Sequence, residues 1–303
     1  MKKNYLYVIF IFTLLIIYLF NSTIVINGVL QYTELFFKKL FPACFIFFVI
    51  GSLLLEYNFP YIITKILHIN GASFYVILLS MISGFPSGSK YISDLYKKDI
   101  ISLKLANYLI MFTHFPNPIF VLGSISLLFK DNLYAIYILI SLILSNLIIG
   151  IIFRPKNKEF IKCNINNNYN FSDCLNKNII NSIKTIILIY GVSVFFYLVS
   201  NIISKYFSSN IYNYILVNGV FDLTNGVFLT SLIRIDFIKA LFILFFISFG
   251  GISINMQVKS IISDTNISYY KFLVGRLLQF IFSIIIFLII IYWSSYFNWV
   301  FTT

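Results

Sequence analysis

A polar stretch from Ser83 to Lys90 interrupts an apolar segment that would otherwise read as one membrane helix. In this stretch Ser87, Ser89 and Lys90 follow Pro86. Serine hydroxyls can cap a new half-helix or donate to a ligand, and the Lys90 ammonium can pair with a carboxylate or a lipid phosphate. Broken backbone survives inside a bilayer only where protein or a polar cavity satisfies its N–H and C=O groups. The stretch is therefore a candidate binding site.

A second interrupted segment, from Asn218 to Gly226, contains an acid. Asp222 lies in it next to Thr224 and Asn225. An ionisable group at membrane depth costs about 2.5 to 3.5 kcal/mol on insertion scales, so such a group usually has a function. Asp222 can bind a proton or a cation, or accept a hydrogen bond from a substrate. If the segment lies at the membrane surface, Asp222 is only a helix cap.

Two more apolar segments are interrupted, at residues 113–118 and 248–251. In the first of these, Pro116 and Pro118 remove two backbone donors and clash with the preceding turn, so a continuous helix is not credible there. Uncharged side chains near such interruptions can bind a polar ligand without the cost of burying a charge. The candidates of this kind are Asn117, Asn255 and Gln257.

The composition is that of a polytopic membrane protein. Of 303 residues, 60% are hydrophobic and 11% are charged, whereas a soluble domain carries about 25% charged residues. Repeated apolar stretches of ~18 residues or more predict a bundle of membrane-spanning helices. The net charge of +12 comes from Lys and Arg residues scattered between these stretches. Such a distribution indicates charged loops and predicts no nucleic-acid partner.

The sequence shows no pattern of an enzyme, a metal site or a cofactor site. It contains no GxSxG, HExxH or P-loop motif. Its three cysteines, Cys44, Cys163 and Cys174, form no CxxC pair, and two histidines are too few for a zinc site of the usual kinds. We therefore predict no catalytic activity, no catalytic residue, no bound metal and no cofactor.

The apolar segments predict about seven spans and two re-entrant hairpins. Residues 1–30 are expected to form an N-terminal transmembrane helix, with residues 27–32 outside. Lys2 and Lys3 place its N-terminus in the cytoplasm, because positive charge is retained on that side. The remaining units are a first repeat at 31–153, a cytoplasmic loop at 154–178 and a second repeat at 179–303.

Both repeats show the same order of elements, namely a span, an interrupted hairpin, an interrupted span and a span, but they begin on opposite sides of the membrane. The interrupted span of the first repeat covers residues 105–129. Paired interruptions in two inverted halves are typical of a transporter with its site near the membrane midplane. Half-helices that begin there direct unpaired N–H groups at the site, which suits a small anion. The alternative is that glycine and proline merely kink packed helices.

The interrupted segments resemble those of the sporulation integral membrane proteins of the YlbJ type, which belong to the nucleoside-recognition, or Gate-domain, membrane proteins. The resemblance rests on Ser83 to Lys90, Phe112 to Gly123, Gly219 to Gly226, and Ser248 to Ser253 with Gln257, Val258 and Arg276. It implies two Gate-like repeats and a fold similar to concentrative nucleoside transporters. It also implies a place in the outer forespore membrane and transport of dipicolinic acid, a small aromatic dianion. Asp222 stands where the family usually has Glu, and His114 where a smaller polar residue is usual.

We therefore expect a transporter that binds a small anionic substrate, dipicolinic acid, between two inverted halves in a lipid bilayer. Two alternatives stay open: a transporter of nucleosides or another metabolite, and a membrane scaffold for spore assembly that transports nothing. The oligomeric state is not readable from these residues. The expected substrate-binding residues are Ser87, Ser89, Lys90, Asn117, Asp222, Thr224, Asn225, Ser253 and Gln257.

Overall fold

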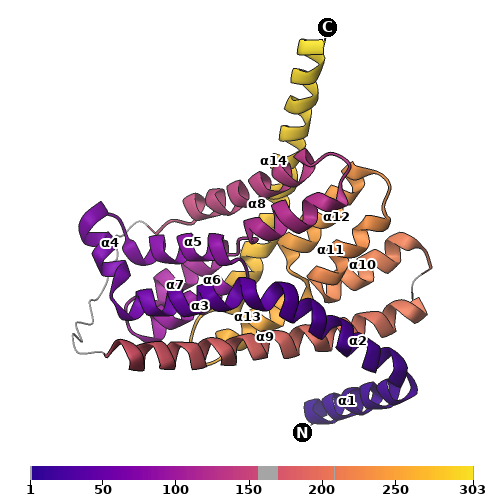
Figure 1. The fold of residues 1–303 in the computed structure, drawn as a ribbon, viewed down its shortest axis with the longest axis horizontal. Coiled ribbons are helices and arrows are strands. Elements are labelled where there is room, and N and C mark those ends of the chain that lie inside the picture. Colours follow the sequence, from indigo (N-terminus) through magenta and orange to yellow (C-terminus); the bar gives the residue numbers. More distant parts are fainter. Residues whose placement is uncertain (1, 156–169, 208, 303) are drawn as a thin grey trace.

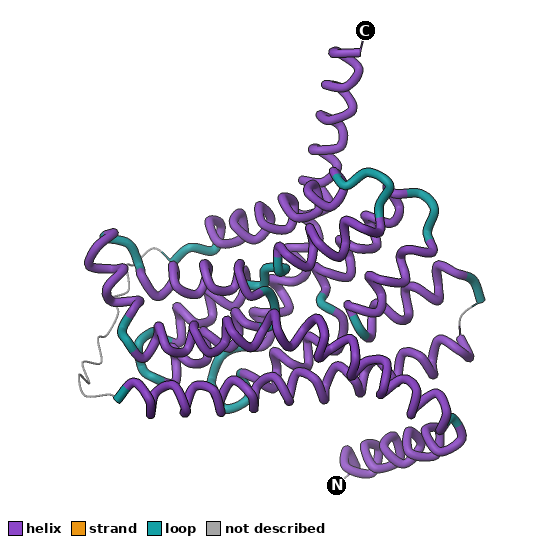
Figure 2. The backbone as a smooth tube through the Cα atoms, viewed as in Figure 1, coloured by secondary structure: helices purple, strands orange, loops and turns teal. Residues whose placement is uncertain are grey.

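Residues 2–155, 170–207 and 209–302 are described by a computed structural model of the protein. All regular secondary structure in these ranges is helical, and most of the helices lie side by side along the long axis of the molecule (Figures 1 and 2). An α-helix satisfies its backbone N–H and C=O groups within its own segment, as lipid surroundings require. The all-α fold predicted from the sequence is confirmed.

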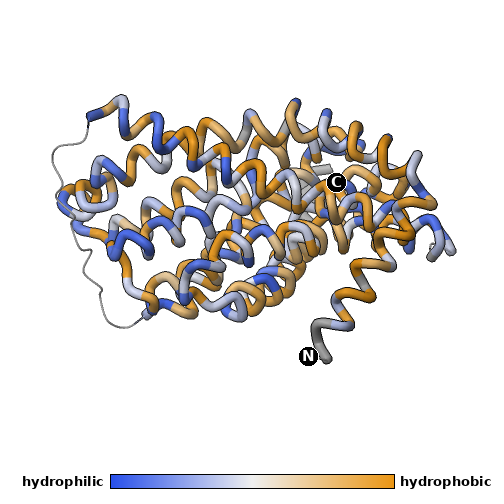
Figure 3. The backbone as a smooth tube through the Cα atoms, turned by 90° about the horizontal axis from the view of Figure 1, so that it is seen from below, coloured by the Kyte–Doolittle hydropathy of each residue, from blue (hydrophilic) through white to orange (hydrophobic). Residues whose placement is uncertain are grey.

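Large apolar side chains are exposed on the outer helices. Ile151 on α8 (Leu133–Ile152) and Leu277 on α14 (Tyr269–Thr302) are examples, with 74% and 61% of their surface exposed. Hydrophobic residues extend along most of the helices (Figure 3). A water-soluble protein rarely exposes so many large apolar groups. The outer surface therefore fits a hydrocarbon environment.

The N-terminal region is a bent pair of helices, whereas one transmembrane helix was predicted for residues 1–30. α1 (Lys2–Phe20) meets α2 (Ser22–Leu35) at an angle of 92°. α2 continues through a π-helical segment, Phe36–Leu40, into α3 (Phe41–Glu56). Residues 27–32, expected to form an external connection, are helical.

The polar residues of α2 explain why this segment is helical, because they pack against protein and do not belong to a solvated loop. Tyr32 is buried, and Thr33 shares a hydrogen bond of 2.6 Å with the hydroxyl of Tyr190. Tyr190 belongs to α9 (Phe171–Phe207), which packs along α2 and α3. A polar helix face that packs on a second helix has the same local composition as a solvated connection.

The first interrupted stretch forms the tip of a helical hairpin. After α4 (Phe59–Leu67), the antiparallel helices α5 (Gly71–Ser83) and α6 (Ser87–Lys97) pack against each other. α5 begins where the Asn70 side chain accepts a hydrogen bond from the Ser73 amide, and it ends at Gly84, whose φ of 74° favours glycine. The predicted first hairpin is therefore present.

The next helix is broken where the two prolines predict it. α7 (Leu103–Phe112) ends before an extended stretch at residues 113–117, and a π-helical segment, Phe120–Ile125, resumes the path. Because Pro116 and Pro118 lack N–H donors, the α-helical hydrogen-bond pattern cannot continue through them. A short 3-10 turn, Ser126–Leu128, then leads to α8.

The second half repeats this order of elements. α9 is followed by a hairpin of α10 (Ile211–Phe221) and α11 (Leu223–Leu229), whose turn is the single residue Asp222. After the 3-10 turn Thr230–Leu232, α12 (Asp236–Phe249) and α13 (Gly251–Ile261) are separated only by Gly250, with a φ of 82°. α14 closes the order.

The two halves interlock across the molecule. α14 packs against α7 and α8, while α9 packs against α2 and α3 (Figure 1). Gly275 lets α14 approach so closely that a Cβ there would overlap the carbonyl of Met111 in α7. The helices of each half are therefore held in place by helices of the other half.

In the part of the chain that the structure describes, four helices are long and apolar enough to cross a membrane, or up to six if each bent pair is one span. About seven spans were predicted. The six segments match six of the predicted spans, and the seventh, at residues 105–129, is the one broken after α7.

Residues 156–169 of the predicted loop at 154–178 lie outside the described residues. The last part of that loop is wrong, because α9 begins at Phe171. Asn and Lys residues in its first turns are compatible with helix and made the segment resemble a solvated loop.

Candidate functional site

Within each half, the tip of the interrupted hairpin packs directly on the interrupted helix. A Cβ on Gly84, at the tip of the α5–α6 hairpin, would lie 2.8 Å from the backbone nitrogen of Asn117. In the second half, a Cβ on Gly251 would lie 3.0 Å from the backbone nitrogen of Leu223, at the tip of the α10–α11 hairpin. Each hairpin tip is therefore seated in the broken helix of its own half.

His114 joins these two pairs. Its ring stacks on Phe85 of the first hairpin tip, with centroids 4.7 Å apart and an interplanar angle of 13°. Its Nε2 atom would lie 3.5 Å from a Cβ on Gly250. All four interruptions predicted from the sequence consequently meet in one region of the fold.

A cavity of about 300 Å³ opens in this region. Small-molecule sites commonly have ~300–1,000 Å³, so its size is at the lower end of that range. Among the described residues that line it none is charged; four are polar and the rest are apolar. The polar ones are Ser83, Asn117, Ser124 and Thr224, and the apolar ones are Leu35, Leu40, Cys44, Phe85, Ile119, Phe120, Leu223 and Phe228.

Asp222 is buried at the turn of the second hairpin and accepts three hydrogen bonds. Its Oδ1 atom accepts from the Asn225 amide at 2.9 Å, which caps α11. Its Oδ2 atom accepts from the hydroxyls of Tyr32 at 3.3 Å and Ser253 at 3.2 Å. Because these donors come from α2, α11 and α13, the carboxylate ties the hairpin tip to two other helices.

The remaining predicted polar residues of the second half have partners inside the protein. The Asn225 side chain donates to Asn218 Oδ1 at 3.0 Å, which crosses the hairpin. Gln257 donates to Ser193 Oγ on α9 at 2.8 Å and is buried. Thr224, in contrast, lines the cavity.

Three predicted residues of the first half make local hydrogen bonds to the backbone in this geometry. Asn117 Oδ1 accepts from the amides of Ile119 and Phe120 at 2.8 and 3.3 Å, so it starts the second part of the broken helix. Ser87 donates to the Gly84 carbonyl, and Ser89 donates to the Pro86 carbonyl at 2.6 Å. Of these, Asn117 also lines the cavity.

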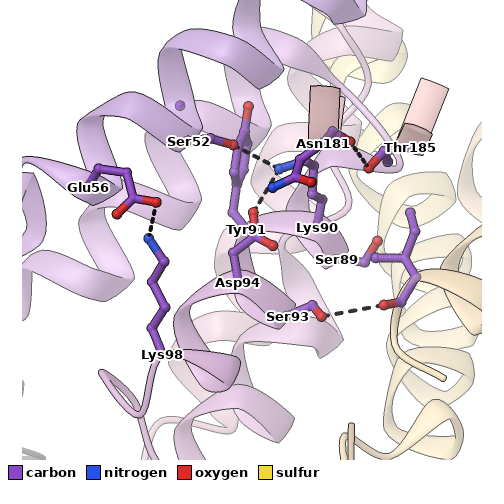
Figure 4. A network of polar contacts seen from close by, with 12 residues as sticks. Ser52, Glu56, Ser89, Lys90, Tyr91, Ser93, Asp94, Lys98, Asn181 and Thr185 are labelled. Carbon is purple, nitrogen blue, oxygen red and sulfur yellow. Dashed lines mark hydrogen bonds and ion pairs between the residues drawn. The ribbon is translucent and has the colours of Figure 1, made fainter. Parts of the chain in front are cut away.

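Lys90 is buried and is directed at α3, as Figure 4 shows. Its Nζ atom donates to Ser52 Oγ at 2.9 Å and to Asp94 Oδ2 at 2.7 Å, and it lies 5.6 Å from the centre of the Phe48 ring. Lys90 is not among the residues that line the cavity. This geometry favours an anchor between hairpin and α3 over direct binding of a substrate.

Lys90→Met should lower the stability of the folded protein by roughly 1 to 2 kcal/mol, because Ser52 and Asp94 lose a charged donor. The loss stays small because the Asp94 side chain is 32% exposed and remains hydrated. Lys97→Met is the matched control, since the ion pair of Lys97 with Asp264 is exposed and 3.7 Å long. Thermal unfolding in one detergent compares them. Equal midpoints for both variants would remove the anchoring role.

Comparison with curated proteins finds a relative in Bacillus subtilis (strain 168), the sporulation integral membrane protein YlbJ. The two are 22% identical over 315 residues, which cover 88% of this chain and 77% of the relative. The chain is similar to a membrane protein of the YlbJ type. This similarity confirms the resemblance seen in the interrupted segments and supports a membrane protein of sporulation. No family model and no solved structure matches it.

Three aromatic residues of the cavity were not among the predicted site residues. They are Phe85, Phe120 and Phe228, and the rings of the last two are 6.2 Å apart in an edge-to-face arrangement. Phenylalanine has no polar group, so the criterion of polar side chains beside a break does not select it. The sequence does indicate two of them by position, because Phe85 lies between Gly84 and Pro86 and Phe120 lies two residues after Pro118.

Tyr32 was also missed, because its segment was expected to lie outside the membrane. Its hydroxyl reaches Asp222 only because α2 is a helix packed in the fold. Within the described residues no group of three His, Cys, Asp or Glu side chains could hold a metal ion. The chemistry that this region offers is hydrogen bonding and aromatic contact with a small ligand.

Proposed function

We propose that this YlbJ-type chain transports a small organic molecule across the membrane, with the cavity as its binding site. The observation that supports this proposal is that both hairpin tips and the broken helix of the first half line one cavity of about 300 Å³, while the broken helix of the second half packs on the second tip. Interrupted helices at corresponding places in two halves are typical of transporters. A scaffold that binds nothing would have no need of four interruptions at one place.

The first candidate substrate is dipicolinic acid, carried across the outer forespore membrane toward the forespore, with the N-terminus of the protein in the cytoplasm. The relationship to a sporulation protein supports this choice. The lining also suits a flat ring, since Phe85, Phe120 and Phe228 offer aromatic faces and Asn117 and Thr224 offer hydrogen bonds. In this proposal the nine residues expected from the sequence bind the substrate directly or hold the groups that do.

A nucleoside is the second candidate, and one observation favours it. The described residues that line the cavity carry no positive charge. The partial positive charge of a half-helix start could replace such a charge, but two of these starts are already capped. Asn117 caps the helical segment that follows it, and Asp222 caps α11. An uncharged ring with hydroxyl groups would need no counter-charge.

Purified protein in liposomes tests both candidates. We expect efflux of trapped dipicolinate at a rate well above that of empty liposomes, and inhibition by pyridine dicarboxylates. No flux of dipicolinate, with or without an ion gradient, while a working relative transports it, would refute the first candidate. Inhibition by nucleosides alone would select the second. No flux of either would leave the scaffold.

Cys44 provides a chemical probe of the cavity, because it lines the cavity and is partly exposed. In a Cys163→Ser background, we expect a maleimide to modify Cys44, while the buried Cys174 reacts slowly. Dipicolinate at ten times its dissociation constant should slow this modification about tenfold, as mass action requires. Mass spectrometry measures the rate, and Cys44→Ser is the control. Modification that is unaffected by every transported compound would place the substrate elsewhere.

A further inference from the structure

His114 lies between two helix starts that lack a side-chain cap. α6 begins after Pro86 and α13 begins after Gly250, and no side chain accepts a hydrogen bond from the first amides of either helix. His114 lines a small cavity together with Pro86, Gly88 and Ser89, and its Nε2 atom faces Gly250. In α6 the amides of Ser87 and Ser89 already donate to the carbonyls of Gly84 and Pro86 at 3.1 Å, which leaves the Gly88 amide together with the first amides of α13. The first N–H groups of a helix carry partial positive charge.

The imidazole itself has an unused polar atom at this place. His114 is 5% exposed, and its buried Nε2 atom has no hydrogen-bond partner. Buried polar atoms are nearly always paired in folded proteins, so an unpaired one calls for a ligand or a water. The unpaired Nε2 atom is evidence independent of the two helix starts, and it lies beside Gly250, where α13 begins.

Arg276 adds a positive charge beside His114. It is 2% exposed and donates to the carbonyls of Met111 at 3.1 Å and His114 at 3.4 Å. Among the described residues, no Asp or Glu forms an ion pair with it, and its Nε atom is unpaired. A buried cation without a counter-ion makes the surrounding space favourable for a negative group.

We propose that His114 and the starts of α6 and α13 form a carboxylate subsite, which the Phe85 ring separates from the main cavity. Phe85 lines that cavity on one side and stacks on His114 on the other. The space at His114 is about 10 Å³, enough for about one water. A carboxylate therefore enters when the Phe85 ring moves aside. The subsite rests on the transport function proposed above and explains how an uncharged cavity serves an acid.

Binding of a graded series of ligands to purified full-length protein tests this subsite. The probes are dipicolinate, picolinate and pyridine, which differ by one carboxylate at each step, and calorimetry measures their affinity. His114→Phe keeps the stack on Phe85 and removes Nε2. We expect it to weaken dipicolinate binding about tenfold or more, since a hydrogen bond to a charged group is lost, and to leave pyridine unchanged.

Two further variants control for structural effects. His114→Gln keeps an N–H donor at similar reach and should recover part of the affinity, whereas the shorter His114→Asn should not. His68→Asn removes the other histidine, which is exposed and has a φ of 55° that Asn tolerates, and should change nothing. If His114→Phe does not fold, the comparison of the Gln and Asn variants decides.

The outcomes separate the subsite from the transport proposal. A folded His114→Phe protein that binds dipicolinate like the wild type overturns the subsite and leaves transport intact. If the wild type binds neither acid, dipicolinate transport fails, and sodium acetate is compared with sodium chloride at equal ionic strength. A rise in unfolding temperature that acetate alone produces and that needs His114 supports the subsite. The same rise with chloride, or no rise, overturns it.

Discussion

Asp222→Ala should abolish transport and destabilise the folded protein by roughly 3 kcal/mol. The carboxylate caps α11 and accepts from the buried hydroxyls of Tyr32 and Ser253. Loss of an N-cap costs about 0.5 to 2 kcal/mol. Each buried hydroxyl left unpaired costs about 1 to 3 kcal/mol more. Because Asp222 caps α11, which carries Leu223 and Thr224 of the cavity lining, the wall of the cavity moves when the cap is lost.

Asp222→Asn separates the structural role of this side chain from its charge. Asparagine keeps an oxygen that can accept from the Asn225 amide, so we expect most of the stability to return. If transport stays absent in this stable variant, the negative charge itself takes part in the cycle. Asp264→Ala is the matched control, because the Asp264 side chain is 82% exposed.

Flux from liposomes and unfolding in detergent measure these effects, and the yield of heat-resistant spores measures them in cells. Wild-type flux in a folded Asp222→Ala protein would show that the carboxylate is dispensable. Loss of flux without loss of stability would contradict the capping role and leave a binding role.

The sequence predicts the breaks in this fold well, because each break has a local cause. Pro116 and Pro118 lack N–H donors, and Gly84 and Gly250 adopt positive φ. The two places where prediction failed lack such a cause. Residues 27–32 and the start of α9 combine polar side chains with good helix formers, and only their packing decides between helix and loop.

The candidate site is predicted less completely than the fold. Asn117 and Thr224 line the cavity, and each lies at a break. Lys90 and Gln257 lie a turn or more past their breaks, where a helix rotates the side chain toward α3 and α9 instead. The direction in which a helical side chain points depends on how far the residue lies from the helix start. The polarity of the residue does not give this direction.

Gly226→Ala should be among the most destabilising single-methyl changes in this protein, at roughly 3 kcal/mol or more. A Cβ at Gly226 on α11 would overlap the Cα of Gly219 on α10, and the added atom would meet backbone on one side. Beyond Gly219 lies the ring of Phe246, so α10 has no free space to move into. Small residues of this kind allow two helices to approach closely in a membrane.

Gly191→Ala makes the same chemical change where nothing lies within 4 Å of the new Cβ. Gly191 is inside α9, so alanine should stabilise the protein by about 0.5 to 1 kcal/mol, because glycine loses more backbone freedom on folding. The difference between the two variants therefore isolates packing from helix propensity. Unfolding of both in the same detergent measures it, and equal midpoints would contradict the close approach of α10 and α11.

This approach also matters for the cavity. Leu223, Thr224 and Phe228 reach the cavity from α11, whose position depends on the contact of Gly226 with Gly219. A bulkier residue at 226 pushes α11 away from α10 and displaces all three. We therefore expect Gly226→Ala to lose protection of Cys44 by dipicolinate as well as stability, whereas Gly191→Ala retains both. Retained protection in a destabilised Gly226→Ala protein would mean that the ligand does not contact the second hairpin.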